Sequence, residues 1–384
     1  MEPLRHGVTR REFLGRTLAG SAFLSALGWQ LANAAAPPAR QRSLILLWMS
    51  GGPSQLETFD PHEGKDIAGG TRSIKTASGA RLAAGLERLA DQMAHVSLVR
   101  SMMSKEGDHE RGAYTVRTGN RPDPTVIHPS IGAILCHELP VAGVDIPRHV
   151  SIMPDRWSGR GGHLGDQYDS FRTGDPRLPV PDTVSHGGPR DGKRLELLNV
   201  AEKAFAKGRG KRVEATGHRD TMARARTMMS SEQLKAFDVS REPLAVQCRY
   251  GDTPFGRGCL AARRLTEAGV RCVEVTLGNW DTHADNHRLC RNLVDILDPA
   301  FAALVADLRE RGTLDRTMVV CAGEFGRTPK INPFAGRDHW PTGFSVALAG
   351  GGLRGGAVVG ETDPEGGPKP KDPVTVESLH ATLL

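Results

Sequence analysis

The sequence of 384 residues lacks several motifs that would identify a common class of enzyme. It contains no Walker-type phosphate loop and no Gly-x-Ser-x-Gly elbow, and the triple glycine at residues 350–352 opens no convincing dinucleotide-binding unit. None of the six cysteines forms a Cys-x-x-Cys pair, which argues against a zinc knuckle or a thioredoxin-like site. Only 5% of the residues are aromatic, too few for a platform that stacks nucleic-acid bases. We therefore expect neither a nucleotide cofactor nor a nucleic-acid partner.

A strong charge of either sign is also missing. The net charge is +6 at pH 7, and the basic residues are scattered along the chain. Four basic and two acidic residues precede residue 35, so the remaining chain carries +4 from 46 basic and 42 acidic residues. Such a mild charge indicates neither nucleic acid nor a membrane surface as a partner. With 39% hydrophobic and 24% charged residues, the composition is that of one large or two smaller globular domains.

The N-terminal residues have the pattern of an export signal. Residues 9–14 read Thr-Arg-Arg-Glu-Phe-Leu, a weakly apolar run covers residues 17–29, and Ala-Asn-Ala at residues 32–34 gives a small-x-small cleavage site. We predict a Tat signal peptide over residues 1–34 that engages the Tat translocase, a linker over residues 35–42, and a periplasmic or otherwise exported protein. An N-terminal helix or anchor is the alternative, but the apolar run is too short for a stable membrane span.

The predicted export route bears on the cysteines and on metal binding. Tat substrates generally fold before export, often with a cofactor already bound, which favours a metal and argues against disulfides. In an oxidising compartment, Cys248 could still pair with Cys259. Cys272 and Cys321 lie in predicted buried strands, where a free cysteine acts as a small apolar residue.

After residue 42, apolar strands alternate with amphipathic helices. Continuous apolar runs predict buried parallel strands at residues 43–49, 272–277, 318–321 and 344–349. Helices are predicted at residues 129–139, with Pro129 in the first turn, at residues 259–268, and across residues 289–308, where Pro299 kinks or divides the helix. Strands that alternate with helices in this way predict an α/β fold, a doubly wound and mostly parallel sheet flanked by helices.

We predict a single domain over residues 43–384 with one long insertion. Residues 151–192 are rich in Gly, Pro, Asp and Arg, and residues 199–237 are polar and helical in character. Together they predict a loop-rich and helical insertion at about residues 151–240. The helix that begins near Val374 has no capping residue before the sequence stops, so we expect the C-terminus to be truncated.

Acidic residues and histidines follow the predicted strands. Asp281 and His283 are two residues apart, so in an extended chain they face the same way, and such a pair is a common metal half-site. A hydrogen-bonded loop pair is the alternative. Asp338 and His339 could ligate two metals, or one could ligate while the other orients its partner. Because ligands bind at the carboxyl ends of parallel strands, we predict these four residues as ligands of a divalent metal, Zn or else Mn or Ca.

Five further residues are candidates for catalysis or substrate binding. Glu324 offers another oxygen donor, or else an ion pair to Arg327, whose planar fork could clamp an anionic substrate. His109 lies in an Asp-His-Glu-Arg run and could be a ligand, a general base, a nucleophile or a hydrogen-bonded loop residue. We predict His109, Arg327 and Glu324 as catalytic. We predict Ser54, Arg111 and Arg327 as substrate-binding, with a turn or cap role as the alternative for Ser54.

Several motifs together resemble one bacterial family. They are the twin-arginine start, Trp-Met-Ser-Gly-Gly-Pro-Ser at residues 48–54, Trp-Asp-Thr-His at 280–283, Gly-Glu-Phe-Gly-Arg-Thr-Pro at 323–329 and Gly-Arg-Asp-His-Trp-Pro at 336–341. Over nearly the whole chain they are similar to the domain of unknown function 1501, common in planctomycetes and related bacteria. The resemblance implies membership of the alkaline phosphatase-like superfamily, which includes sulfatases. It implies a parallel sheet between helices, with one or two divalent metals at the strand ends.

The match to that superfamily is partial. Three residues resemble its metal ligands, namely Asp281, His283 and His339. Phe325, after Glu324, stands where a histidine ligand is usual, and Ser50 stands where the first strand normally ends in an aspartate. His109 stands where a sulfatase has its catalytic cysteine, and the Cys-x-Pro-Ser-Arg motif is missing, so a formylglycine sulfatase is not expected.

Two functional hypotheses follow from the residues and the resemblance. The first is an exported, metal-dependent hydrolase of phosphate or sulfate esters, acting on a small anionic ester or on a sulfated or phosphorylated glycan. The second is a catalytically degenerate protein that keeps the fold and serves as a binding or scaffold module. The missing aspartate at position 50 and the missing histidine at position 325 favour the second hypothesis.

Overall fold

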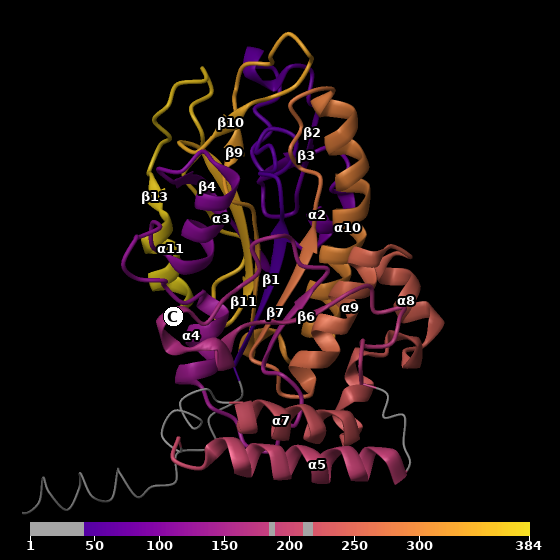
Figure 1. The fold of residues 1–384 in the computed structure, drawn as a ribbon. Coiled ribbons are helices and arrows are strands. Elements are labelled where there is room, and N and C mark those ends of the chain that lie inside the picture. Colours follow the sequence, from indigo (N-terminus) through magenta and orange to yellow (C-terminus); the bar gives the residue numbers. More distant parts are fainter. Residues whose placement is uncertain (1–41, 184–188, 210–217) are drawn as a thin grey trace, which may run out of the picture. The chain divides into compact units, whose positions relative to one another are not determined.

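The computed structural model describes residues 42–183, 189–209 and 218–384. The predicted signal peptide lies outside these ranges and stays a prediction. Within them, the apolar runs form a nine-stranded sheet in the order β12-β4-β11-β8-β1-β7-β5-β6, with β13 paired to β4 (Figure 1). Its strands are β1 (Ser43–Met49), β4 (Val96–Met103), β5 (His149–Ile152), β6 (Phe171–Thr173), β7 (Cys272–Leu277), β8 (Thr317–Ala322), β11 (Phe344–Gly350), β12 (Val358–Val359) and β13 (Val374–Thr375).

The strand directions bring distant segments to one edge of this sheet. β1 is parallel to β7 and β8, and β5 is parallel to β6 and β7. β11 is antiparallel to both β8 and β4, so β4 runs in the same direction as β8. The carboxyl ends of β1, β4, β7 and β8 and the start of β11 therefore share one edge, which is where open α/β sheets bind ligands.

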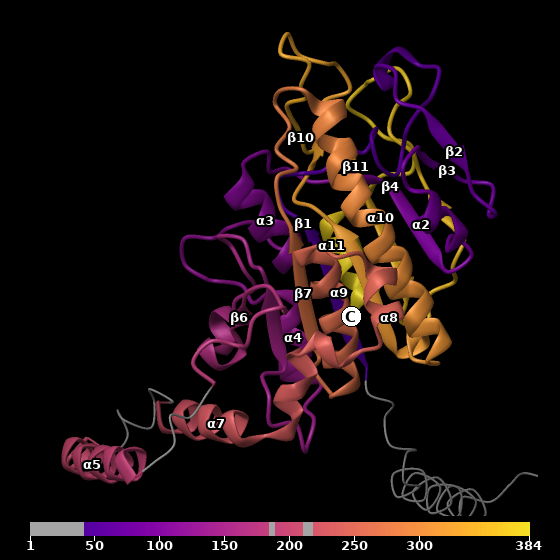
Figure 2. The ribbon, with the colours of Figure 1, turned by 90° about the vertical axis from the view of Figure 1, so that its right-hand side faces the viewer.

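Helices cover both faces of the sheet because the β1 side chains alternate between two cores. Ile45, Leu47 and Met49 join the first core, and Leu44, Leu46 and Trp48 join the second. The first core includes residues of α2 (Glu87–Asp91), α8 (Leu244–Tyr250), α9 (Pro254–Glu267) and α10 (Asn286–Glu310). The second includes residues of α3 (His109–Thr118), α4 (Ile131–Glu138) and α11 (Val376–Leu383) (Figure 2). This architecture confirms the predicted doubly wound, mostly parallel α/β fold.

The other elements are short or belong to the predicted insertion. Two small sheets pair β2 (Ser73–Lys75) with β3 (Arg81–Ala83), and β9 (Gly326–Arg327) with β10 (His339–Trp340). The described part of the insertion contains the helices α5 (Pro189–Ala206) and α7 (His218–Ser230). The 3-10 turns are η1 (Asp66–Ala68), η2 (Gly162–Leu164), η3 (Asp166–Tyr168), η4 (Glu232–Phe237), η5 (Val239–Arg241) and η6 (Leu314–Arg316).

Several local predictions need correction. The segment predicted as an excursion contains β6, which pairs with β5 at the sheet edge. Of the two predicted effects of Pro299, division of the helix is wrong, because α10 runs unbroken through this residue, and a kink stays a prediction. Pro129 precedes α4 and is not in its first turn, because Ser130 is the N-cap and accepts a hydrogen bond from the backbone N–H of Ala133. All six cysteines are free, so the pairing of Cys248 with Cys259 is absent. No described helix is both long and apolar enough to cross a membrane.

Candidate metal centre

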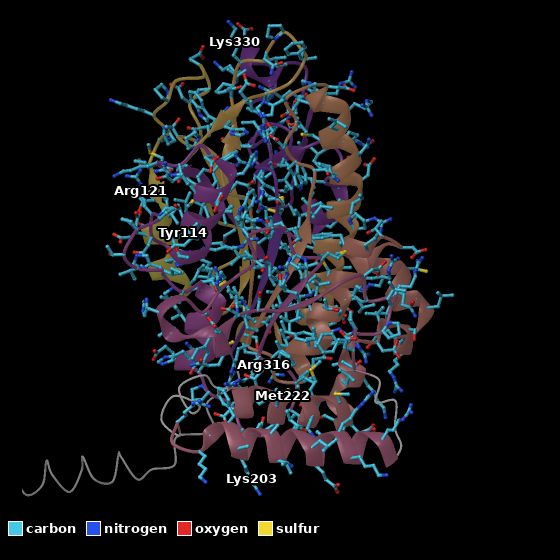
Figure 3. The ribbon with its side chains drawn as sticks, viewed as in Figure 1. Tyr114, Arg121, Lys203, Met222, Arg316 and Lys330 are labelled. Carbon is cyan, nitrogen blue, oxygen red and sulfur yellow. The ribbon has the colours of Figure 1, made fainter. Side chains whose placement is uncertain are left out.

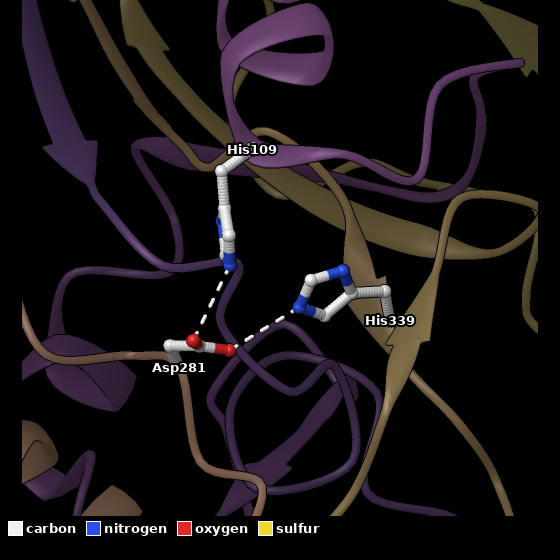
Figure 4. A group of neighbouring side chains, drawn as sticks. All are labelled: His109, Asp281 and His339. Carbon is white, nitrogen blue, oxygen red and sulfur yellow. Dashed lines mark hydrogen bonds and ion pairs between the residues drawn. The ribbon is translucent and has the colours of Figure 1, made fainter.

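Four side chains from three segments meet at the carboxyl edge of the sheet. His109 is the first residue of α3, and Asp281 and His283 lie in the turn after β7. His339 opens β10, which pairs it with Arg327 of β9. One potential ligand atom from each of His109, Asp281 and His339 lies within 4.8 Å of the other two (Figure 4).

Asp281 is the hub of this group. Its Oδ1 lies 3.1 Å from His283 Nε2 and 3.3 Å from His339 Nε2, and these two nitrogens are 3.0 Å apart. Its Oδ2 lies 3.3 Å from His109 Nε2. Zinc bonds of about 2.0–2.1 Å in a tetrahedron place neighbouring donor atoms about 3.3 Å apart. The observed separations therefore fit a metal ion, and the side chain of Asp281 is 44% exposed, so the group is open to solvent.

The hydrogen bonds of the three imidazoles also fit a cation. Each Nδ1 faces an oxygen acceptor: Glu324 for His109 (2.8 Å), Asp338 for His283 (2.8 Å) and the carbonyl of Gly107 for His339 (2.7 Å). With hydrogen on Nδ1, each Nε2 presents a lone pair to the group, the arrangement of histidines that bind metals. The facing lone pairs of His283 and His339 repel unless a proton or a cation lies between them.

His109 Nε2 is a buried nitrogen without a hydrogen-bond partner among the described residues. The atom lies 3.3 Å from Asp281 Oδ2, a distance at which the protonated imidazole forms an ion pair with the carboxylate. The proximity of Asp281, followed by the hydrogen bond to Glu324, raises the pKa of His109 to about 9. Without a cation, the imidazole is therefore protonated on Nε2 as well as on Nδ1 at neutral pH. A bound cation would replace the proton on Nε2.

We expect this exchange to make metal binding pH-dependent. A cation at Nε2 displaces a proton whose pKa is about 9, so affinity should rise with pH through the range up to that value. Zinc affinity measured by competition with a coloured chelator, between about pH 6 and pH 9, tests this expectation. The dependence should be weaker in His109→Gln, and an equally steep dependence in that variant would contradict the assignment.

The electrostatics of Asp281 favour its ionised form. Burial works to raise its pKa, but contacts with His109 and His339 and the Arg327 guanidinium outweigh burial and hold the pKa well below its usual range. The carboxylate is therefore available to a cation without first losing a proton.

Apolar and glycine residues shape the floor of the centre. The buried ring of Phe325 packs against His109 and His339, with centroid distances of 5.1 Å and 4.5 Å. It supplies no ligand but fixes the orientation of both imidazoles. Gly51 has φ of +113°, and a Cβ there would lie 2.5 Å from the backbone nitrogen of Asp281. A side chain at position 51 would therefore displace the hub carboxylate.

Two residues predicted as parts of the site, Asp338 and Glu324, contact the imidazoles from the outside, through their Nδ1 atoms. Asp338, predicted as a metal ligand or as a residue that orients its partner, faces His283 Nδ1 at 2.8 Å, while His339 is oriented by the carbonyl of Gly107. Glu324 is almost fully buried, and its Oε1 contacts His109 and accepts from the backbone N–H of Gly51 at 2.8 Å. Its expected ion pair is therefore made with a histidine and not with Arg327.

The prediction that Arg327 clamps a substrate disagrees with its position. The side chain is 0% exposed, and Nη2 lies 2.5 Å from Asp281 Oδ1. Its remaining donors face the backbone carbonyls of Gly51, Gly52 and Arg337. A guanidinium enclosed by three carbonyls and a carboxylate has no surface to offer a substrate anion.

The predicted substrate-binding residues Ser54 and Arg111 differ in exposure. Ser54 is fully buried in the interior beside Glu57, so its predicted contact with substrate also disagrees with the structure. Arg111 is half exposed on α3 and pairs with Glu106 at 2.9 Å. Arg121 (Figure 3) binds the same carboxylate at 2.5 Å. Arg111 therefore remains a candidate for contact with an anion.

Sequence reasoning missed a buried polar network beside the centre. Arg117 of α3 contacts Glu274 of β7 through two bonds of 2.9 Å and Asp155 at 3.1 Å. Asp155 also accepts from the backbone N–H of Trp157, whose ring is parallel to that of His109 within 9°. The only signal in the sequence is Glu274, a charged residue inside an otherwise apolar strand.

Replacing Asp338 with asparagine should separate an orienting role from a ligating one. Asparagine keeps an acceptor near His283 Nδ1 but removes the charge, so metal affinity should fall by about 10–100-fold, as for other residues that orient ligands. Zinc affinity measured by competition tests this value. A complete loss of bound metal would instead mean that Asp338 is itself a ligand.

The fold and the site define a doubly wound α/β protein with a candidate metal centre at the carboxyl edge of its sheet. The chain belongs to the family described as protein of unknown function (DUF1501), whose sequence model matches residues 41–384. This match confirms the resemblance drawn from the motifs. No curated protein shows significant sequence similarity to the chain.

Several solved structures show weak similarity. The structure of Ps i-CgsB in complex with k-i-k-neocarrahexaose is 10% identical, with a TM-score of 0.43, over 89% of this chain and 71% of that chain. The PsFucS1 sulfatase from Pseudoalteromonas sp. is 12% identical, with a TM-score of 0.42, over 92% and 69%. The lipoteichoic acid synthase LtaP from Listeria monocytogenes is 8% identical, with a TM-score of 0.40, over 84% and 68%. Scores and identities this low establish no shared activity.

Proposed function

We propose that the protein is a metal-dependent hydrolase of phosphate or sulfate esters. The observation that carries the proposal is the convergence of three imidazole Nε2 atoms on Asp281, each with its Nδ1 facing a fixed oxygen acceptor. His109, Asp281, His283 and His339 would hold the ion. The ester class comes from the resemblance of the strand-end motifs to the alkaline phosphatase-like superfamily.

The residues of the chain have separable roles in such a reaction. A bound divalent ion supplies Lewis-acid polarisation of the ester oxygen and a lowered pKa for a bound water. Glu324, Asp338 and the carbonyl of Gly107 hold the imidazoles in the ligating tautomer. Arg111, half exposed at the start of α3, would pair with a substrate anion such as a small ester or a sulfated or phosphorylated glycan.

A substrate screen on metal-loaded protein tests the proposal. Full-length protein loaded with Zn, Mn or Ca is assayed with 4-nitrophenyl phosphate, bis(4-nitrophenyl) phosphate and 4-nitrophenyl sulfate. We expect turnover of at least one ester, lost on addition of a chelator and restored by the ion. The matched control is Asp281→Asn under the same loading. Protein that binds the ion but hydrolyses none of these esters would contradict the hydrolase proposal.

That negative outcome would favour the second candidate, a metal-containing binding module without turnover. Phe325 fills with an aromatic ring the position where a ligand is usual, and Arg327 is too deeply buried to hold an anion. Both observations remove groups that a hydrolase could use. Retention of the metal-loaded protein on immobilised sulfated glycan, with no release of sulfate, would identify such a module.

We further propose that the protein is exported by the Tat route. Replacement of Arg10 and Arg11 by lysine should retain most of the protein in the cytoplasm of a Tat-competent bacterium, as shown by fractionation and immunoblotting. Replacement of Arg5 and Arg16 by lysine is the matched control, since it changes the same number of basic residues outside the pair. Equal export of both variants would overturn the proposal.

A further inference from the structure

Arg327 places a permanent positive charge against the carboxylate at the hub of the candidate metal centre. A guanidinium stays protonated at every accessible pH. Its Nη2 lies 2.5 Å from Asp281 Oδ1, and its other donors bind the carbonyls of Gly51, Gly52 and Arg337. The carbonyls of Gly51 and Gly52 belong to the loop after β1, and that of Arg337 belongs to the loop between β9 and β10, so backbone from both loops holds the guanidinium in place.

The donor atoms of the centre lie around both oxygens of Asp281. On one side lie Asp281 Oδ2 and His109 Nε2, 3.3 Å apart. On the other side lie Asp281 Oδ1 and the Nε2 atoms of His283 and His339. Two cations that both used Asp281 would each need one of its carboxylate oxygens. Arg327 already contacts the oxygen that one of the two cations would need.

The formal charges lead to the same result. The carboxylates of Asp281, Glu324 and Asp338 carry three negative charges, and Arg327 contributes one positive charge. One divalent cation brings this sum to zero, and a second would leave an excess of two positive charges. Uncompensated charge in a partly buried site is strongly unfavourable.

We propose that the centre takes a single divalent cation because the Arg327 guanidinium stands where a second cation would need Asp281. Arg327 is thus a positioning residue that prevents the hub carboxylate from bridging two ions. The inference rests on the proposed function only in assuming that the centre binds metal.

The metal content of the full chain tests this proposal directly. Protein saturated separately with Zn and with Mn is freed of excess ion by gel filtration, and metal per chain is measured by mass spectrometry of the element and of the native protein. We expect one ion per chain with either metal. Two ions per chain would overturn the single-ion proposal and leave the hydrolase proposal standing. No bound ion would overturn both.

Two matched variants test the role of Arg327 itself. Arg327→Gln keeps amide donors for the carbonyls but removes the charge, so it should take up a second Mn ion when the ion is in excess. Arg337→Gln removes an equally buried guanidinium that pairs with Glu57 and does not contact Asp281, so it should stay at one ion. One ion in Arg327→Gln, or two in Arg337→Gln, would show that Arg327 does not exclude the second cation. If Arg327→Gln does not fold, the wild-type metal content still decides the single-ion proposal.

Discussion

Replacing Asp281 with asparagine is expected to lower the metal affinity of the protein by more than about 100-fold, beyond the loss typical of residues that only orient ligands. Among the described residues, Asp281 is the carboxylate that contacts all three imidazoles, and asparagine removes its charge while leaving an oxygen for Arg327. Element analysis after gel filtration and competition with a chelator measure the loss. Circular dichroism of the metal-free proteins checks that the variant is folded.

Asp285→Asn is the matched control for this experiment. Asp285 lies in the same turn, is exposed and pairs with Arg288, and it contacts none of the three imidazoles in the described structure. Its φ is 48°, a left-handed conformation that asparagine also tolerates. We expect its affinity for metal to match that of the wild type. Equal affinities in Asp281→Asn and Asp285→Asn would contradict the metal centre as we have assigned it.

Replacing Arg337 with methionine is expected to lower the free energy of unfolding by about 3–5 kcal/mol, the usual effect of removing one partner of a buried ion pair. Arg337 is 0% exposed, its Nη2 lies 2.9 Å from Glu57 Oε1, and it also donates to the carbonyls of Ile67 and Pro329. The variant leaves the Glu57 carboxylate buried without its cation. Urea unfolding followed by fluorescence measures the change.

The exposed pair of Arg81 and Glu63 provides the comparison. These side chains are 52% and 38% exposed, so Arg81→Met should cost less than about 1 kcal/mol. In the double variant Glu57→Gln with Arg337→Met, much of the lost stability should return, because no buried charge remains unpaired. A loss below about 1 kcal/mol in Arg337→Met would show that the buried pair of Arg337 and Glu57 contributes little to the free energy of unfolding.

The strand-end residues show what could be read from sequence. The apolar runs predicted the buried strands. The positions of Asp281, His283 and His339 after these runs predicted that the three residues lie at one edge of the sheet. A two-residue spacing in extended chain correctly placed the first two beside each other. Local pattern was sufficient here because strand burial and strand direction are dictated by continuous apolar sequence and by alternation with helices.

For Asp338 and His339, the local sequence pattern could not predict which side chain faces Asp281. Adjacent residues in a strand point to opposite sides, so only the β9–β10 pairing decides which of them faces the hub. His339 does, held by the carbonyl of Gly107, while Asp338 turns to His283. These partners come from segments that are far apart in the sequence, and no spacing rule relates them.

By itself, the sequence determined the fold class and the edge of the sheet where the polar groups gather, since both follow from the apolar runs. Only the tertiary structure decided the part that each group plays. It made His109 a neighbour of Asp281, placed Glu324 behind an imidazole, and enclosed Arg327 among the carbonyls of Gly51 and Gly52. Burial and hydrogen bonding of a side chain depend on atoms brought near it by distant segments, and such proximity exists only once the sheet has formed.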